Sequence, residues 1–235
     1  GIILVTGPTG SGKTTTLYAA LQQINQDSRN IMTIEDPIEY DLNGISQTAV
    51  NTQTGMTFAQ GLRSILRQDP NVIMVGEIRD LETAKVAVQA SLTGHLVFST
   101  VHTNTAAGTI TRLQDMGVEP FLLSSGVIGV LAQRLVRRLC NECKRPDPLA
   151  TTTGDAFAAV GCSHCQHTGY QGRVGIYELL EVTEAIKKSI HDGCGEQQLQ
   201  QQARQQHTSL HQHGLQLVAQ GITSTDEVLR VSQDS

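Results

Sequence analysis

An eight-residue stretch near the start of the sequence most constrains the fold. It reads Gly7-Pro8-Thr9-Gly10-Ser11-Gly12-Lys13-Thr14 and matches the pattern G-x-x-x-x-G-K-[ST]. An apolar run at 2–5 precedes it, and apolar residues at helical spacing follow it, as a phosphate-binding loop between a strand and a helix requires. A chance glycine-rich turn is the alternative, but the flanking segments argue against it. The stretch therefore predicts a nucleotide-binding α/β domain.

The residue types in this loop suit the binding of ATP. Glycines let backbone N–H groups converge on phosphate oxygens, and the N-terminus of the next helix adds partial positive charge. We expect Lys13 to reach the β- and γ-phosphates, and the Thr14 hydroxyl to ligate Mg²⁺. The residues expected to contact the nucleotide in this segment are Gly7, Pro8, Thr9, Gly10, Ser11, Gly12, Lys13, Thr14 and Thr15.

Segments typical of strands and of helices alternate through the first part of the chain. The further predicted strands are 30–34, 45–50 (a short strand or hairpin arm), 72–75 and 96–100. The further predicted helices are 58–66, 81–92, 106–116 and 120–132. This order predicts a parallel sheet with a RecA-like core.

Acidic residues follow two of these predicted strands, at the end of the sheet where ligands bind in open α/β folds. Glu77 follows 72–75, in the place of a Walker B acid, and Glu35, Asp36 and Glu39 follow 30–34. ATP hydrolysis needs one acid beside Mg²⁺ and one that orients or deprotonates the attacking water. We expect Glu77 and at least one of the other three to be functional rather than solvated loop carboxylates.

Two histidines, His95 and His102, bracket the predicted strand at 96–100. A single histidine in such a place is as often a hydrogen-bonded structural residue as a reporter of the γ-phosphate. Thr100 and Thr103 lie beside them, and the pair in this setting favours a functional role.

Four cysteines form two C-x-x-C pairs, Cys140/Cys143 and Cys162/Cys165. Two thiolate pairs can complete a closed tetrahedral zinc site, which would be structural because no position remains for water. Reduced thiols without metal are the alternative, and disulfides fit a chain of intracellular character less well. A loose stretch at 147–159 separates the pairs. We expect helices from residue 174 onward, and hence three parts: a RecA-like ATPase domain (1–134), a zinc subdomain (135–173) and a helical subdomain (174–235).

The composition bears on partners. The formal net charge is −5, aromatic residues make up 3% and tryptophan is absent, which argues against nucleic acid as a partner. No apolar run approaches the roughly 18 residues of a membrane span. Because Gly1 begins the strand that leads to the phosphate-binding loop, we expect the sequence to be part of a longer protein.

The segments 7–14, 35–40, 76–80 and 93–103 resemble the Walker A, Asp-box, Walker B and His-box motifs of the ATPases of type II secretion and type IV pilus assembly. The resemblance covers the whole chain and, with the four cysteines, is greatest to the GspE/PulE type. Two features depart from that pattern. Asn71 stands where the family often has Asp, and the insert between the cysteine pairs is short.

The resemblance implies roles for individual residues. Glu39 would activate the water, and Glu77 would act with Mg²⁺ and the γ-phosphate. His102 and Arg79 would contact the nucleotide, and Arg63, Arg67 and Arg79 become candidates for nucleotide or subunit-interface contacts.

The resemblance also implies a motor that hydrolyses Mg-ATP to power protein secretion or pilus assembly at the cytoplasmic face of the bacterial inner membrane. It would act as a homo-oligomer, in full length a hexamer, on inner-membrane platform proteins, without nucleic acid and with only peripheral membrane contact. This segment alone would hydrolyse ATP slowly, because the family's transition-state arginines lie largely in its N-terminal half. The alternatives are a RecA-like nucleic-acid translocase, a conjugation-type secretion ATPase and a non-enzymatic zinc adaptor. Only Arg134, Arg137 and Arg138 favour the translocase.

Overall fold

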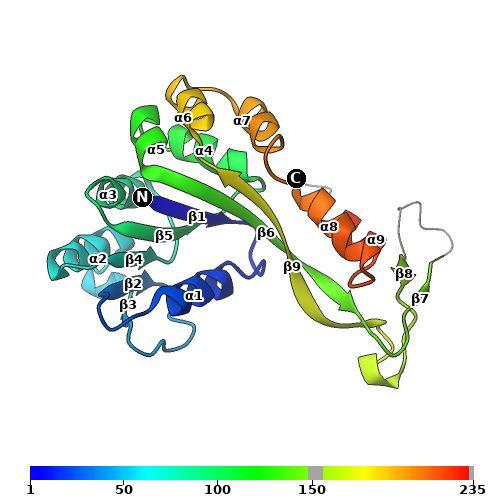
Figure 1. The fold of residues 1–235 in the computed structure, drawn as a ribbon. Helices are drawn as coiled ribbons and strands as arrows, with labels where there is room; N and C mark the ends of the chain where they lie inside the picture. The colour runs from blue at the N-terminus through cyan, green and yellow to red at the C-terminus, as the bar shows by residue number, and fades with distance from the viewer. Residues whose placement is uncertain (148–155, 233–235) are drawn as a thin grey trace.

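A seven-stranded sheet in the order β3-β2-β4-β5-β1-β6-β9 forms the centre of the molecule (Figure 1). The computed structural model describes residues 1–147 and 156–232, so most of the loose stretch expected at 147–159 lies outside it. Neighbouring strands are parallel throughout, except that β9 runs antiparallel to β6. The strands are β1 (Ile2–Thr6), β2 (Ile31–Glu35), β3 (Ser46–Ala49), β4 (Val72–Val75), β5 (Leu96–Val101), β6 (Val127–Leu139) and β9 (Tyr170–Glu181). The predicted parallel sheet and RecA-like core are confirmed.

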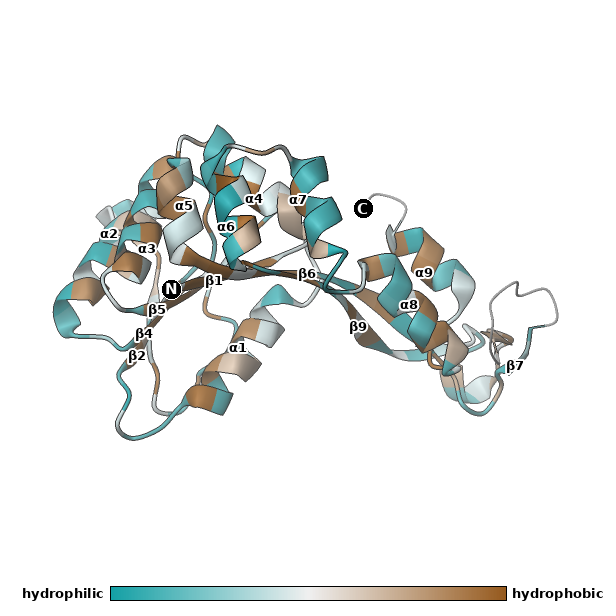
Figure 2. Cartoon of the chain, turned by 45° about the horizontal axis from the view of Figure 1, so that its top comes forward, coloured by the Kyte–Doolittle hydropathy of each residue, from teal (hydrophilic) through white to brown (hydrophobic). Residues whose placement is uncertain are grey.

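Helices cover both faces of this sheet. Figure 2 shows α1 beneath the sheet and α2 to α7 above it. The helices are α1 (Lys13–Ile24), α2 (Phe58–Ile65), α3 (Leu81–Leu92), α4 (Ala106–Asp115), α5 (Pro120–Gly126), α6 (Glu184–His191), α7 (Glu196–Ala203), α8 (Leu210–Ala219) and α9 (Thr225–Ser232). The central strand β4 is buried along its whole length, because Val72 and Met74 pack on the α1 side while Ile73 and Val75 pack on the other.

Side-chain caps make two helices begin directly after segments that carry predicted site residues. Asp80 accepts a hydrogen bond from the Thr83 N–H at 2.8 Å and starts α3. Thr105 accepts one from the Gly108 N–H at 2.8 Å and starts α4. The loops that hold Glu77 and His102 are therefore short, with a strand at one end and a capped helix at the other.

Two predicted helical segments are wrong. The helix expected at 120–132 ends at Gly126, and β6 begins at Val127. The segment from 174 onward begins as strand β9, which continues to Glu181. Both segments are apolar enough for either structure. Pairing of β6 with β1 and of β9 with β6 decides between them, and such pairing between distant segments leaves no local signal in the sequence.

The paired strands β6 and β9 extend beyond the sheet as a long two-stranded arm (Figure 1). Helices α8 and α9 pack against the arm, and its far end carries the cysteine pairs and a two-stranded sheet of β7 (Arg145–Pro146) and β8 (Phe157–Ala158). Both boundaries of the expected division into 1–134, 135–173 and 174–235 fall inside these strands. No helix in the described residues combines the length and apolarity needed to cross a membrane.

Candidate nucleotide-binding site

A cavity of about 570 Å³ lies at the carboxyl ends of β1, β2, β4 and β5. Most of the residues expected at a nucleotide site line it: Thr9, Gly10, Gly12, Lys13, Thr14, Thr15, Glu39, Glu77, Arg79 and His102. The remaining loop residues, Gly7, Pro8 and Ser11, are not among the lining residues. The sheet thus gathers predicted residues from four separate segments around one space.

Close packing against β6 fixes the shape of the phosphate-binding loop. Gly12 adopts a φ of 87°, and a Cβ there would lie 2.9 Å from Gln133 Nε2. A Cβ on Gly7 would lie 2.4 Å from the Gln133 carbonyl oxygen. Gln133 Nε2 also donates to the Ser11 carbonyl oxygen at 2.7 Å, and its Oε1 accepts from Thr16 Oγ1 at 2.7 Å. Only glycine fits at these two positions, and Gln133 bonds both the loop, at Ser11, and the first turn of α1, at Thr16.

Lys13 is the first residue of α1, and its largely buried side chain turns back to the start of the loop. Its Nζ donates to the carbonyl oxygens of Gly7 at 2.9 Å and Pro8 at 3.1 Å. Burial lowers the pKa of Lys13 from its usual value, and the nearby Glu77 carboxylate acts in the opposite direction. The ammonium is thus placed at the cavity wall, between the loop backbone and an acidic side chain.

The first turn of α1 fits a phosphate group. No side chain caps its N-terminus and no acidic residue lies in its first turn, so the partial positive charge there is not neutralised from within the helix. Ser11 Oγ is buried without a hydrogen-bond partner in the structure. An uncapped helix N-terminus beside a glycine-rich loop suits a ligand that carries several acceptor oxygens.

Glu77, Arg79 and His102 form one cluster on the cavity wall. Arg79 Nε lies 2.7 Å from Glu77 Oε2, and His102 Nε2 lies 3.3 Å from the same oxygen. Glu77 is buried, whereas the side chain of Arg79 is 70% exposed. The carboxylate is therefore fixed, and the guanidinium is free to extend into solvent or toward a ligand.

The acids that follow β2 differ in their environments. Glu35 is buried and accepts hydrogen bonds from Tyr18 Oη, from Thr33 Oγ1 at 2.5 Å and from Gln47 Nε2 at 3.1 Å. Its oxygens are thus occupied by protein donors. Asp36 and Glu39 are both exposed and both line the cavity, so either has the freedom that a water-activating group needs, and it is the family resemblance that favours Glu39.

His95, Arg63 and Arg67 do not line the cavity. His95 is at the amino end of β5, where its Nδ1 lies 3.0 Å from the Ala90 carbonyl oxygen, whereas His102 follows the carboxyl end. On α2 and the turn after it, Arg63 Nη1 contacts Glu82 Oε1 at 2.5 Å and Arg67 Nη2 donates to Ser64 Oγ at 3.2 Å. The histidine pair therefore divides into one structural residue and one site residue.

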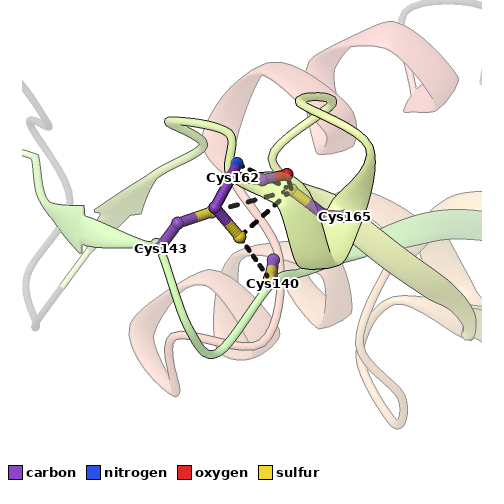
Figure 3. Close-up of side chains that lie close together, drawn as sticks. All are labelled: Cys140, Cys143, Cys162 and Cys165. Carbon is purple, nitrogen blue, oxygen red and sulfur yellow. Dashed lines mark hydrogen bonds between the residues drawn. The ribbon is translucent and has the colours of Figure 1, made fainter.

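The four cysteines converge at the end of the β6–β9 arm (Figure 3). Their sulfur atoms all lie within 4.8 Å of one another, and the distances from Cys140 to Cys162 and from Cys143 to Cys165 are 3.9 and 3.8 Å. Sulfur atoms at the corners of a tetrahedron about 2.3 Å from a zinc ion lie about 3.8 Å apart. The cluster has the ligand types, number and spacing of a closed metal site.

Backbone N–H groups point at these sulfur atoms. Gly161 donates to Cys143 Sγ at 3.3 Å, and Cys162 and Gly169 both donate to Cys165 Sγ at 3.2 Å. Burial raises the pKa of Cys143 to about 11. Burial acts in the same direction on Cys165, but the two N–H donors outweigh it and lower that pKa to about 6. Such donors stabilise thiolates, which are the form that binds metal.

Comparison with known proteins agrees with this geometry. The profile of a family described as "Type II/IV secretion system protein" matches residues 1–230. The chain belongs to this family.

Several relatives within this secretion-protein family match the entire chain. It is 58% identical to "Type II secretion system protein E" of Aeromonas hydrophila over 245 aligned residues and 59% identical to "Type II secretion system ATPase E" of Vibrio cholerae over 246. Each match covers 100% of this chain and 49% of the relative, so the chain spans about half the length of the curated relatives it matches. Among solved structures, the pilus retraction motor PilT with bound ADP superposes with a TM-score of 0.78 at 37% identity, over 100% of this chain and 62% of that one.

Sequence reasoning missed several residues at this cavity. Leu135 of β6 and Arg173 of β9 line the cavity, and Gln133 braces its loop from behind. These residues come from the two strands that were expected to be helix or zinc subdomain. For Gln133, the one signal in the sequence is its polarity, because it lies in a segment that is otherwise largely apolar.

The arginines that favoured a nucleic-acid partner mostly form contacts within the protein. Arg134 is buried and donates from Nη2 to the Asn104 carbonyl oxygen at 2.8 Å. Arg137 pairs with Glu227 at 2.7 Å and lies 4.0 Å from the centre of the Tyr170 ring. Two of the three side chains are thus bound to the fold and do not form an open basic face.

Proposed function

We propose that this chain binds Mg-ATP in the cavity and hydrolyses it, as the ATP-hydrolysing part of a secretion or pilus motor. One observation carries the proposal. The carboxyl ends of β1, β2, β4 and β5 bring Lys13, Glu39, Glu77 and His102 around one cavity at the N-terminus of α1. Family membership and the relatives named as secretion ATPases support the same reading.

Each side chain has a role in this proposal. Lys13 and the loop N–H groups bind the β- and γ-phosphates, and Thr14 and Glu77 would hold Mg²⁺, which when bound supplies positive charge beside these phosphates. Glu39 orients the attacking water and takes its proton, while the bond between the γ-phosphorus and the bridging oxygen breaks to give ADP and phosphate. His102 and Arg79 lie beside Glu77, where they can respond to the γ-phosphate.

The cysteine cluster is proposed to hold structural Zn²⁺. Cys140, Cys143, Cys162 and Cys165 supply four ligands, so no position remains for water or substrate. The ion would join the turn after β6 to the segment before β9 and so close the end of the arm. We also propose that the chain divides into an ATPase part (1–134), a zinc part (135–173) and a helical part (174–235). Strands β6 and β9 each cross one of the two boundaries.

The assembly is proposed from the relatives. They are named for type II secretion and for pilus retraction. We propose that the full-length protein forms a homo-oligomer, of hexameric order, at the cytoplasmic face of the inner membrane, where platform proteins hold it and nucleic acid plays no part.

Lys13→Ala tests the proposal, with Lys85→Ala on the exposed face of α3 as the matched control. Lys13→Ala should weaken binding of a fluorescent ATP analogue and abolish hydrolysis of radiolabelled ATP under single-turnover conditions, and Lys85→Ala should match the wild type in both assays. Equal binding and hydrolysis by all three proteins would instead favour the zinc adaptor.

A further inference from the structure

A buried hydrogen-bond network joins α1 to the segment that carries Glu39. Tyr18 lies on α1 and is fully buried, outside the lining of the cavity. Its hydroxyl donates to Glu35 Oε2, and it accepts from the Glu39 backbone N–H at 3.3 Å. One side chain of the phosphate-binding helix therefore bonds the backbone of the proposed water-activating residue.

The same network ties this segment at two further backbone positions. Gln47 of β3 donates from Nε2 to the Tyr40 carbonyl oxygen at 3.2 Å and accepts at Oε1 from the Leu42 N–H at 2.6 Å. Gln47 Nε2 also lies 3.1 Å from Glu35 Oε1 and 3.4 Å from Tyr18 Oη. The backbone of 39–42 is therefore held at three points, by the buried Tyr18 and the half-buried Gln47.

The position of Tyr18 on α1 makes this network relevant to catalysis. Thr14 and Tyr18 are one helical turn apart and share a face of α1. The proposed magnesium ligand and the residue that bonds Glu39 therefore belong to one rigid element. Burial, and after it the bond to Glu35, raises the pKa of Tyr18 above its usual value, so the hydroxyl keeps the proton that it donates.

We infer that Tyr18 is a positioning residue, whose hydroxyl sets the backbone of Glu39 relative to the phosphate-binding loop. The inference rests on the proposed function, because it takes Glu39 as the residue that acts on water. A merely structural role for Tyr18 would depend on its ring, which is buried in the α1 core and meets the Tyr40 ring edge-on at 4.7 Å. The hydroxyl alone makes the contacts with Glu35 and Glu39, so removing it leaves the packing of the ring in place and tests these two bonds.

Tyr18→Phe in the full chain is the test, with Tyr177→Phe on β9 as the control for loss of a tyrosine hydroxyl elsewhere. We expect kcat of Tyr18→Phe to fall about 10- to 100-fold, as for a small misplacement of a catalytic group, while KM for ATP changes less than about twofold. Amide hydrogen exchange should accelerate at 39–42 and stay unchanged in β4 and β5. Tyr177→Phe should match the wild type in every readout.

Comparison with Glu39→Gln separates the inference about Tyr18 from the proposed role of Glu39 in hydrolysis. Slow turnover in Glu39→Gln beside normal turnover in Tyr18→Phe would overturn the inference alone. Normal turnover in both would overturn the role of Glu39 as well. A rise in KM at unchanged kcat would also overturn the inference, since it would place Tyr18 in nucleotide binding. Should Tyr18→Phe fail to fold, Gln47→Met removes the bonds to Tyr40 and Leu42 and must show the same loss of kcat and faster exchange.

Discussion

Gln133 of β6 donates a hydrogen bond from Nε2 to the carbonyl oxygen of Ser11 at 2.7 Å, and so joins the phosphate-binding loop to the strand beside it. The same side chain accepts from Thr16 in the first turns of α1. Strand β6 continues without a break from this contact to Leu139, directly before Cys140. The loop and the cysteine cluster are therefore connected by one continuous strand.

Gln133→Met is expected to weaken nucleotide binding. The change keeps the side-chain volume close to that of glutamine but leaves the Ser11 carbonyl and the Thr16 hydroxyl without their partner, at a cost of about 1–3 kcal/mol. Part of that cost destabilises the ordered conformation of the loop, which nucleotide binding requires. The dissociation constant for a fluorescent ADP analogue should therefore rise about tenfold. Gln89→Met on the exposed face of α3 is the control and should bind as the wild type does. Unchanged affinity in Gln133→Met would show that the loop does not depend on β6 for its shape.

The site was more predictable from the sequence than the path of the chain that completes it. Lys13, Glu77 and His102 each follow an apolar run of a few residues, and the rule that ligands bind at the carboxyl ends of parallel strands placed them together. The same rule could not choose among Glu35, Asp36 and Glu39. The structure sets Glu35 apart, because Tyr18, Thr33 and Gln47 from three separate elements occupy its oxygens, whereas Asp36 and Glu39 both stay exposed at the cavity.

The second half of the sheet was misread for a physical reason. The run from Val127 to Leu131 is apolar with one glycine, and it directly follows Gly126, where α5 ends. Local propensity leaves such a run undecided, and pairing with β1 decides it. The sequence predicts helices and a zinc subdomain, and not strands of the central sheet, for the segments that form β6 and β9. It therefore does not place Leu135 and Arg173 at the cavity.

The cysteine cluster is expected to bind about one zinc ion per chain, and loss of the ion should loosen the end of the arm. Cys143→Ser removes one of four ligands, so zinc measured by a colorimetric chelator should fall to the background level and the thermal midpoint should drop. Proteolysis should increase at 140–147 and 156–169, because a bound ion would close the turns there. Cys194→Ser, which changes a cysteine outside the cluster, is the control and should retain both zinc and midpoint. A wild-type protein without zinc, whose midpoint does not respond to added zinc, would favour reduced thiols without metal.

A buried carboxylate between two arginines should make the attachment of α9 to the arm depend on pH. Glu227 pairs with Arg137 at 2.7 Å and with Arg230 at 2.9 Å. Burial alone would raise the pKa of Glu227, but the bonds from Arg230 and Arg137 outweigh it and lower the pKa to about 2. The folded pKa is thus below the unfolded one. The stabilisation is complete above the unfolded pKa, near the usual value of 4.5, and is lost as the pH falls toward about 2.

Glu227→Gln should therefore lower the free energy of unfolding by about 2 kcal/mol at pH 7, a value reduced from the full pKa shift because both guanidinium groups are about half exposed to solvent. The difference from the wild type should shrink between about pH 4 and pH 2, as the wild-type carboxyl loses its advantage. Urea unfolding at several pH values measures both effects. Glu184→Gln, at an exposed pair with Lys187, is the control and should change the free energy by less than about 0.5 kcal/mol. A difference for Glu227→Gln that stays constant down to pH 2 would mean that packing of the side chain, and not its charge, holds α9 to β6.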